Sequence, residues 1–279
     1  MLLCYIINCL FVLDYLKMSE KYKNLCESIK IIETLRSENG CKWDREQTHK
    51  SLRTNILEEA YETVDAIDSC DTSNLKEELG DVLLQVLLHS QIAKEENVFD
   101  IEDVAKVLNE KLIRRHPHVF GDVKVQNSDE IVKNWEKIKK EEKKDKRKSL
   151  MDGVSKSQSA LLSALKISKK AVSVGFEWQN EQQIYDCVKS EFEEFKEAKN
   201  FDEKEDEFGD ILFAAVNLAR YNKINPELAL IRANKKFMAR FKKMEELTQK
   251  PLETLSFEEY DQLWKKAKIA LQADNNDLN

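Results

Sequence analysis

The sequence has few of the residues that usually interrupt helices: its 279 residues include six glycines and three prolines. Glycine and proline disfavour helix interiors and mark turns, so their scarcity predicts a mostly helical protein. The six glycines are scattered singly and form neither a G-x-G-x-x-G fingerprint nor a Walker A loop. Any phosphate-binding site must therefore be built from side chains.

The sequence also has no excess of basic residues, since the formal net charge is -7 and the pI is near 5.4. This balance argues against a general nucleic-acid binder, which needs a basic face. Hydrophobic residues at 42% are enough for a core, and charged residues at 35% indicate an unusually charged surface, which together argue against disorder, membrane spanning and a membrane partner. The six cysteines include no C-x-x-C pair, which predicts reduced thiols in a cytoplasmic protein rather than a zinc site.

Residues 1–17 form an apolar run that is a poor signal peptide and too short to span a membrane. No Lys or Arg precedes the run, and Asn8 and Asp14 interrupt it. We expect residues 1–17 to be an upstream extension from a misplaced start codon, with the native protein beginning at Met18.

Two segments of the chain resemble each other. Each contains E-x-x-E followed by E-x-x-D, with a glycine directly before the aspartate. Glu191 stands 132 positions after Glu59, and Glu207 stands 129 positions after Glu78, so one register covers both motifs. A dense charge run, KIKKEEKKDKRKS, separates the copies and indicates a solvated linker. The chain is therefore predicted to be all-α, with an N-terminal module over 18–148 and a C-terminal module over 149–279.

The repeated carboxylates predict a metal site in each module. An isolated E-x-x-E is usually a solvated helix face, but here the face of Glu78 and Asp81 continues through Gln85, Leu88 and Ile92 into an apolar helix. Burying several like charges is costly without a compensating cation. Because the candidate ligands are all carboxylates, the sequence favours Mg²⁺ or Mn²⁺ over zinc or iron.

Basic and aromatic residues follow each acidic set in the same order. Lys111 and Arg115 share a helix face, as do Lys236 and Arg240, which would present two cations to a polyphosphate. Trp135 precedes Lys139 by four residues, and Trp264 precedes Lys268 in the same way. Each tryptophan could stack on a base while its lysine contacts a phosphate.

The ordered motifs GCKWDREQTHKSL, EELGD, KLIRRHPHVFGD, VGFEW, EFGDILFAAVNLAR and NKKFMARF resemble those of the MazG family of nucleoside triphosphate pyrophosphohydrolases, over about residues 20–270. The resemblance implies the all-α fold of the superfamily that includes dimeric dUTPases, with four-helix-bundle cores completed in a homodimer. It also implies Mg²⁺-dependent hydrolysis of a nucleoside triphosphate to a nucleoside monophosphate and pyrophosphate.

Carried over residue by residue, the resemblance assigns a metal quartet and a nucleotide-binding set to each module. The C-terminal quartet is Glu191, Glu194, Glu207 and Asp210, with Lys236, Arg240, Trp264 and Lys268 at the nucleotide. The N-terminal quartet is Glu59, Glu62, Glu78 and Asp81, with Lys111, Arg115, Trp135 and Lys139 at the nucleotide.

The two quartets differ in one neighbouring residue. The N-terminal module has Glu58, a spare carboxylate that could take a proton from the attacking water, where the C-terminal module has Ser190. In family members whose halves differ, the C-terminal half is the active one, and the resemblance of NLAR and NKKFMARF to working C-terminal halves favours that half here. The N-terminal set is nevertheless the more complete, so the sequence leaves the active half open.

Three alternative functions are weighed against this one. The first is a specialised pyrophosphohydrolase for one nucleotide, such as dUTP or a phosphoribosyl nucleotide, which the long duplicated architecture disfavours. The second is a ferritin-like iron protein, which requires Glu-x-x-His on two helices, whereas only Glu46 and His49 have this spacing. The third is a non-catalytic helical partner protein, although drift would be expected to break at least one of the eight motif carboxylates.

Overall fold

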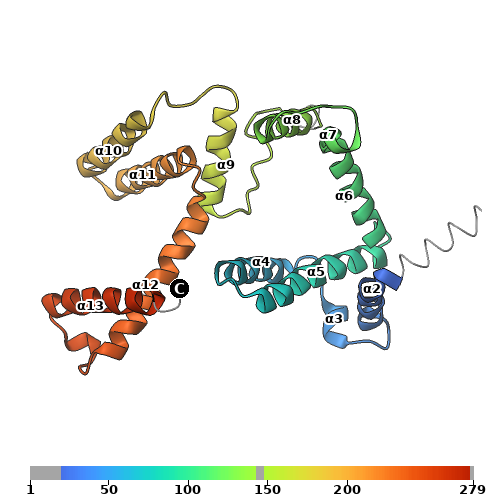
Figure 1. Ribbon diagram of the computed structural model, residues 1–279, viewed down its shortest axis with the longest axis horizontal. Coiled ribbons are helices and arrows are strands. Elements are labelled where there is room, and N and C mark those ends of the chain that lie inside the picture. Colours follow the sequence, from blue (N-terminus) through green and yellow to red (C-terminus); the bar gives the residue numbers. More distant parts are fainter. Residues whose placement is uncertain (1–19, 143–147, 277–279) are drawn as a thin grey trace, which may run out of the picture. The chain divides into compact units, whose positions relative to one another are not determined.

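The computed structural model describes residues 20–142 and 148–276, so the expected extension at residues 1–17 lies outside the described residues. Within these ranges every regular element is a helix (Figure 1), which confirms the predicted all-α fold. The chain divides into two compact units, one ending at Glu141 and the other beginning at Glu142. None of the described helices is both long enough and apolar enough to cross a membrane.

The first unit is arranged around its longest helix, α5. Helix α4 packs along α5, and α2 and α6 also pack on it, while α3 contacts α2 and both α7 and α8 contact α6. The elements are α2 (Lys23–Arg36), α3 (Lys42–Glu46), α4 (Arg53–Asp68), α5 (Thr72–Glu95), α6 (Ile101–Arg115), α7 (Pro117–Phe120) and α8 (Ser128–Glu141).

A polar cap fixes the start of α5. The carboxylate of Asp71 accepts hydrogen bonds from the backbone N–H groups of Ser73 and Asn74, at 3.0 Å each. Such a cap satisfies N–H groups that the first turn of a helix leaves without partners. Because only the short segment 69–71 separates α4 from α5, the two helices run antiparallel and their motif residues can meet.

The core of the first unit covers one half of α5. Ile32 from α2 and Leu52, just before α4, pack with Leu87, Leu88 and Ile92 of α5. Gln85, Leu88 and Ile92 are all buried, as the helix-face pattern predicts. The core does not include the N-terminal half of α5, where the acidic motif lies.

The second unit repeats this arrangement. Helix α10 packs along α11, α9 packs on α11 and α12, and α12 pairs with α13. The elements are α9 (Ala160–Val172), α10 (Glu181–Glu197), α11 (Phe201–Tyr221), α12 (Pro226–Leu247), the short 3₁₀ helix η2 (Leu252–Thr254) and α13 (Phe257–Asn276). Its buried apolar residues are Leu165, Ile184, Ile211, Ala214, Val216, Met244 and Ala267.

The paired glycines of the two acidic motifs lie on exposed helix faces. Apart from chain neighbours and the backbone of the same helix, no atom of the described residues lies within 4 Å of where a Cβ atom would stand on Gly80 or Gly209. Large apolar side chains flank each glycine, because Leu79 and Leu83 are 53% and 38% exposed and Phe208 and Leu212 are 50% and 47% exposed. We call Leu79, Gly80 and Leu83, and likewise Phe208, Gly209 and Leu212, the glycine faces. A glycine inside a helix costs about 1 kcal/mol relative to alanine, and nothing within either unit explains it.

Candidate active site

The first acidic motif gathers where α4 and α5 meet. Carboxylate oxygens of Glu59 from α4 and of Glu78 and Asp81 from α5 all lie within 4.8 Å of one another. Partial burial raises the pKa of Glu59 above its usual value, and the charge of Asp81 raises it further. Burial and the charges of Glu62 and Asp81 raise the pKa of Glu78. All four carboxylates of the predicted N-terminal quartet therefore act on one another.

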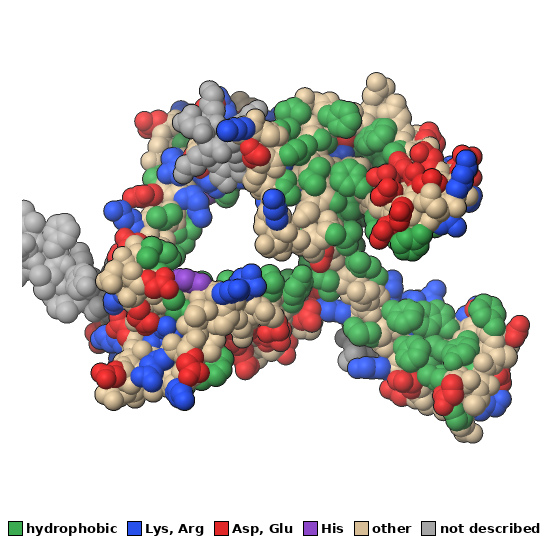
Figure 2. Space-filling view, turned by 180° about the vertical axis from the view of Figure 1, so that it is seen from behind, with side chains coloured by type: hydrophobic (Ala, Val, Ile, Leu, Met, Phe, Trp, Pro, Cys, Tyr) green, Lys and Arg blue, Asp and Glu red, His purple; other side chains and the backbone are tan. Residues whose placement is uncertain are grey.

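The second unit contains an equivalent cluster between α10 and α11. Glu191, Glu194 and Glu207 each place a carboxylate oxygen within 4.8 Å of the others. Burial raises the pKa of Glu207, and the charges of Glu194, Asp210 and Glu191 add to this effect. The acidic side chains of helices α10 and α11 gather beside exposed hydrophobic side chains (Figure 2).

The carboxylates are more exposed in the chain than the sequence pattern suggests. Glu78 and Asp81 are half-buried, while Glu194 and Asp210 are exposed. The expectation that the helix face carries its carboxylates into packing is therefore only partly correct. The physical reason in the first unit is that α2 and Leu52 cover α5 from Leu84 onward and leave the preceding turns uncovered.

The immediate neighbours of the two clusters differ. Glu58 is exposed on α4 beside Glu59, whereas the hydroxyl of Ser190 donates a hydrogen bond to Glu194 at 3.0 Å. Ser190 therefore orients one carboxylate of the second cluster, a role that the sequence did not suggest. The Cys187 thiol lies 3.5 Å from a Glu191 oxygen, and burial raises the pKa of this thiol.

Helices α6 and α12 carry the predicted cations, and α8 and α13 carry the tryptophans with Lys139 and Lys268. The Arg240 guanidinium lies over the Trp264 ring, 5.5 Å from its centroid, and Phe237 packs on the same ring. Trp135 instead meets His116 edge-on at 5.1 Å. In the parts of the chain that the structure describes, the following predicted cations have no ion-pair partner: Lys111, Lys236, Arg240 and Lys268.

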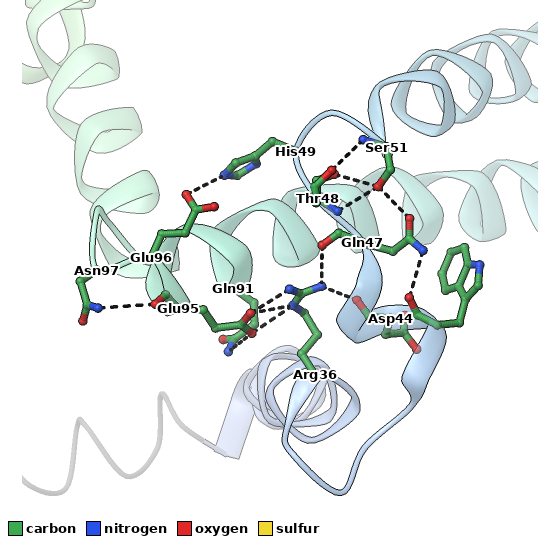
Figure 3. A network of polar contacts seen from close by, with 11 residues as sticks. Arg36, Asp44, Gln47, Thr48, His49, Ser51, Gln91, Glu95, Glu96 and Asn97 are labelled. Carbon is green, nitrogen blue, oxygen red and sulfur yellow. Dashed lines mark hydrogen bonds and ion pairs between the residues drawn. The ribbon is translucent and has the colours of Figure 1, made fainter.

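Each unit contains an arginine clamp that the sequence did not predict. Arg36 of α2 donates to Glu95 of α5 at 2.8 and 3.0 Å and to the carbonyl oxygens of Asp44 and Gln47 (Figure 3). Arg36 thereby ties the long helix to Asp44 and Gln47, which follow the G-x-x-W segment at residues 40–43. The contact joins residues 59 positions apart, so no local pattern in the sequence predicts it.

The second clamp holds the equivalent G-x-x-W segment with a different helix. Arg220 of α11 donates to both carboxylate oxygens of Glu177 at 2.5 and 2.6 Å and to the hydroxyl of Ser168 at 2.7 Å. The hydroxyl of Ser168 in turn donates to Asn217 at 2.6 Å. Hydrogen bonds from Arg220 lower the pKa of Glu177, and the Trp178 backbone N–H and the charge of Arg220 lower it further.

The chemistry of both clusters fits a hard divalent cation. Each provides carboxylate oxygens from two facing helices, and the like charges raise one another's pKa. Mg²⁺ and Mn²⁺ prefer such oxygen ligands. A cation bound between the carboxylates would offset the repulsion between their negative charges.

The fold and the two clusters together define an all-α protein with a duplicated carboxylate site. Residues 47–120 match the MazG nucleotide pyrophosphohydrolase domain. The chain is 49% identical over 245 residues to the nucleoside triphosphate pyrophosphohydrolase/pyrophosphatase MazG of Thermotoga maritima, an alignment that covers 87% of this chain and 94% of that protein.

Two further relatives extend the comparison. The chain is 42% identical over 253 residues to the nucleoside triphosphate pyrophosphohydrolase of Escherichia coli K12, covering 85% of this chain and 94% of the relative. It is also 50% identical over 245 residues to the uncharacterized protein YabN of Bacillus subtilis, covering 85% of this chain and 50% of that one. The chain belongs to the MazG family of nucleotide pyrophosphohydrolases.

Proposed function

We propose that the protein hydrolyses nucleoside triphosphates to nucleoside monophosphates and pyrophosphate in the presence of Mg²⁺. The observation that carries the proposal is the duplicated cluster of mutually repelling carboxylates. Family membership supports it, since relatives that the chain nearly spans bear the name nucleoside triphosphate pyrophosphohydrolase.

In this proposal the carboxylate quartets hold the metal, and the metal supplies Lewis-acid polarisation of phosphate oxygens and of the attacking water. The remaining work belongs to the side chains of this protein. Lys236 and Arg240 of α12 and Lys111 of α6, which have no ion-pair partner among the described residues, bind the phosphates and neutralise charge on the leaving pyrophosphate. A carboxylate outside the quartet takes the proton from water: Glu58 at the first cluster, and Glu193 or Asp206 at the second, where Ser190 replaces that glutamate.

The activity test is hydrolysis by the full chain with product identification. Chromatography should detect nucleoside monophosphate and pyrophosphate rather than nucleoside diphosphate and phosphate. A panel of standard and altered triphosphates, with dUTP included, separates broad from narrow base preference. Nucleoside diphosphate as the main product would contradict the proposal.

The second test measures how much of the hydrolytic activity each module contributes. We propose that the second cluster carries most of the turnover, so Glu191→Gln should remove most of the activity and Glu59→Gln little. A required Glu58 base predicts the reverse, because only the first cluster has this neighbour. Equal partial losses would mean that both clusters turn over substrate, and full activity in the double variant would refute the site.

We also propose that the protein is a homodimer in which a second copy packs against the glycine faces. These faces combine exposed apolar side chains with a glycine that has no neighbour in its own unit, a combination that permits close approach of another helix. Gly80→Leu should therefore weaken the dimer, although leucine is the better helix former.

Light scattering measures the oligomeric state. The wild type should have twice the chain mass of 32.6 kDa, and Gly80→Leu should shift the protein toward that single mass. Lys106→Leu is the control, since it adds the same side chain at an exposed position of α6. A wild-type protein of single chain mass at micromolar concentration would exclude the dimer.

A further inference from the structure

A pair of histidines links the two metal-site helices of the first unit at the end away from the carboxylates. The Nδ1 atoms of His49 and His89 are 2.8 Å apart, their ring planes differ by 9°, and their centroids are 5.1 Å apart. A ring nitrogen lies about 1.1 Å from its ring centre, so these distances require the rings to meet edge to edge in one plane. The contact is a head-on hydrogen bond with one proton between two nitrogens, which tolerates little sliding of one helix past the other.

His49 is rigidly connected to α4. Thr48 and Ser51 exchange hydrogen bonds between their backbone N–H groups and hydroxyls at 2.9 and 3.1 Å, and this turn leads directly into the helix (Figure 3). The other ring nitrogen of His49 lies 4.0 Å from Glu96, next to the clamped Glu95. A shift of the His49 ring is therefore a shift of α4.

The second unit has a different polar contact at the corresponding place. Glu181, the first residue of α10, stands 132 positions after His49, as Glu191 does after Glu59. Its carboxylate accepts a hydrogen bond of 2.8 Å from the side-chain amide of Asn222, at the end of α11. Leu218 stands where His89 stands in the first unit, and Asn222 lies one turn further along the chain, so each unit has a polar contact between the helices at this end although the residues differ.

The metal site needs such a contact because its own charges separate the helices. The carboxylates of α4 and α5 repel one another, and a slide of one residue moves a helix by about 1.5 Å. A shift of that size would separate oxygens that now lie within 4.8 Å. The preserved contacts lie ten residues from Glu59 and from Glu191, counted from His49 and from Glu181.

We propose that the His49–His89 and Glu181–Asn222 contacts are register pins, positioning contacts that hold the two carboxylate-bearing helices of each unit in the alignment that binds the metal. The inference rests on the proposed function, since it assumes that the clusters bind a divalent cation. The four pin residues take no part in the chemistry, and their effect reaches the metal only through the helices.

The first test measures Mn²⁺ binding to the full chain by electron paramagnetic resonance of the free ion. Glu207→Gln is present throughout, so that the first cluster is observed alone. His89→Leu, which introduces the residue found at this position in the second unit, should raise the Mn²⁺ dissociation constant about three- to tenfold, the effect of one lost hydrogen bond. His89→Asn should restore the affinity to within about twofold, because its amide can still bond to the His49 Nδ1 atom.

The second test exchanges the hydrogen-bond donor and acceptor of the Glu181–Asn222 contact. Glu59→Gln is present throughout, so that Mn²⁺ binding to the second cluster is observed alone. Asn222→Asp places a carboxylate against Glu181 and should weaken Mn²⁺ binding. Adding Glu181→Gln reverses donor and acceptor and should recover the affinity. If the Glu181–Asn222 contact only stabilises the fold, the Mn²⁺ affinity of the double variant should recover no further than its melting temperature does.

The control is Ile92→Val, a core change on α5 that lowers stability without touching the pin. If it weakens Mn²⁺ binding as much as His89→Leu does at equal loss of melting temperature, the pin proposal is wrong. Unchanged affinity in His89→Leu, with binding still abolished by Glu59→Gln, would also overturn the pin while leaving the proposed function intact. Unchanged binding in Glu59→Gln itself would reject the metal site first.

Discussion

The Arg220 clamp allows a quantitative prediction of stability. In Arg220→Met the second unit loses three charge-assisted hydrogen bonds and leaves Glu177 with only the Trp178 backbone N–H as donor. Removing one partner of a buried ion pair costs about 3–5 kcal/mol. The Glu177 side chain is 30% exposed and water can partly replace the arginine, so we expect a loss of about 2–4 kcal/mol. For a unit of this size the melting temperature should fall by about 10 °C.

Differential scanning calorimetry of the full chain without divalent metal measures this loss. The double variant Arg220→Met with Glu177→Gln should recover part of it, because no unpaired carboxylate then remains. The clamp lowers the pKa of Glu177 from its usual value of about 4.5. Its stabilisation is therefore complete above that pH and disappears as the pH falls through the lower, folded value. A fall of less than 2 °C at neutral pH, or a difference that persists in strong acid, would refute the reasoning.

Two further predictions concern stability. Glu207→Gln should abolish metal binding at the second cluster and, without metal, should raise the melting temperature. Because the pKa of Glu207 is raised, this gain in melting temperature should shrink as the pH falls through that pKa. A variant that melts at a lower temperature than the wild type at neutral pH would contradict the repulsion within the cluster. Gly40→Ala should lower the melting temperature of the first unit, because a Cβ atom there would stand 2.3 Å from the carbonyl oxygens of Thr34 and Leu35, and calorimetry showing no loss would contradict this close approach.

The sequence predicted the features that depend on local spacing. Residues three apart share a helix face, so Glu78 and Asp81 had to lie together, and the short segment after Asp68 made the meeting with Glu59 foreseeable. The extent of burial was not predictable in this way. It depends on which parts of α5 the other helices cover, and α2 reaches only its C-terminal half.

Contacts between distant residues were missed because their partners lie in different elements. The sequence pattern around His49 indicated only a single Glu-x-x-His spacing. Its partner His89 lies 40 positions away on α5, so the contact between them could not be predicted. The buried arginines were likewise invisible as clamps. A single charge near the end of an apolar helix is common, and only the fold shows that Arg220 bonds to Glu177 inside one G-x-x-W segment and that Arg36 bonds to residues just after the other.

The different origin of the two clamps limits how freely the halves could be recombined. In the first unit the arginine comes from the opening helix α2, and in the second it comes from the long helix α11. A chimera that exchanged α2 for α9 would give one half both arginines and leave the other half with Glu95 and no cation. The two halves therefore resemble each other in sequence, but an exchange of single helices between them would leave buried charges without their partners.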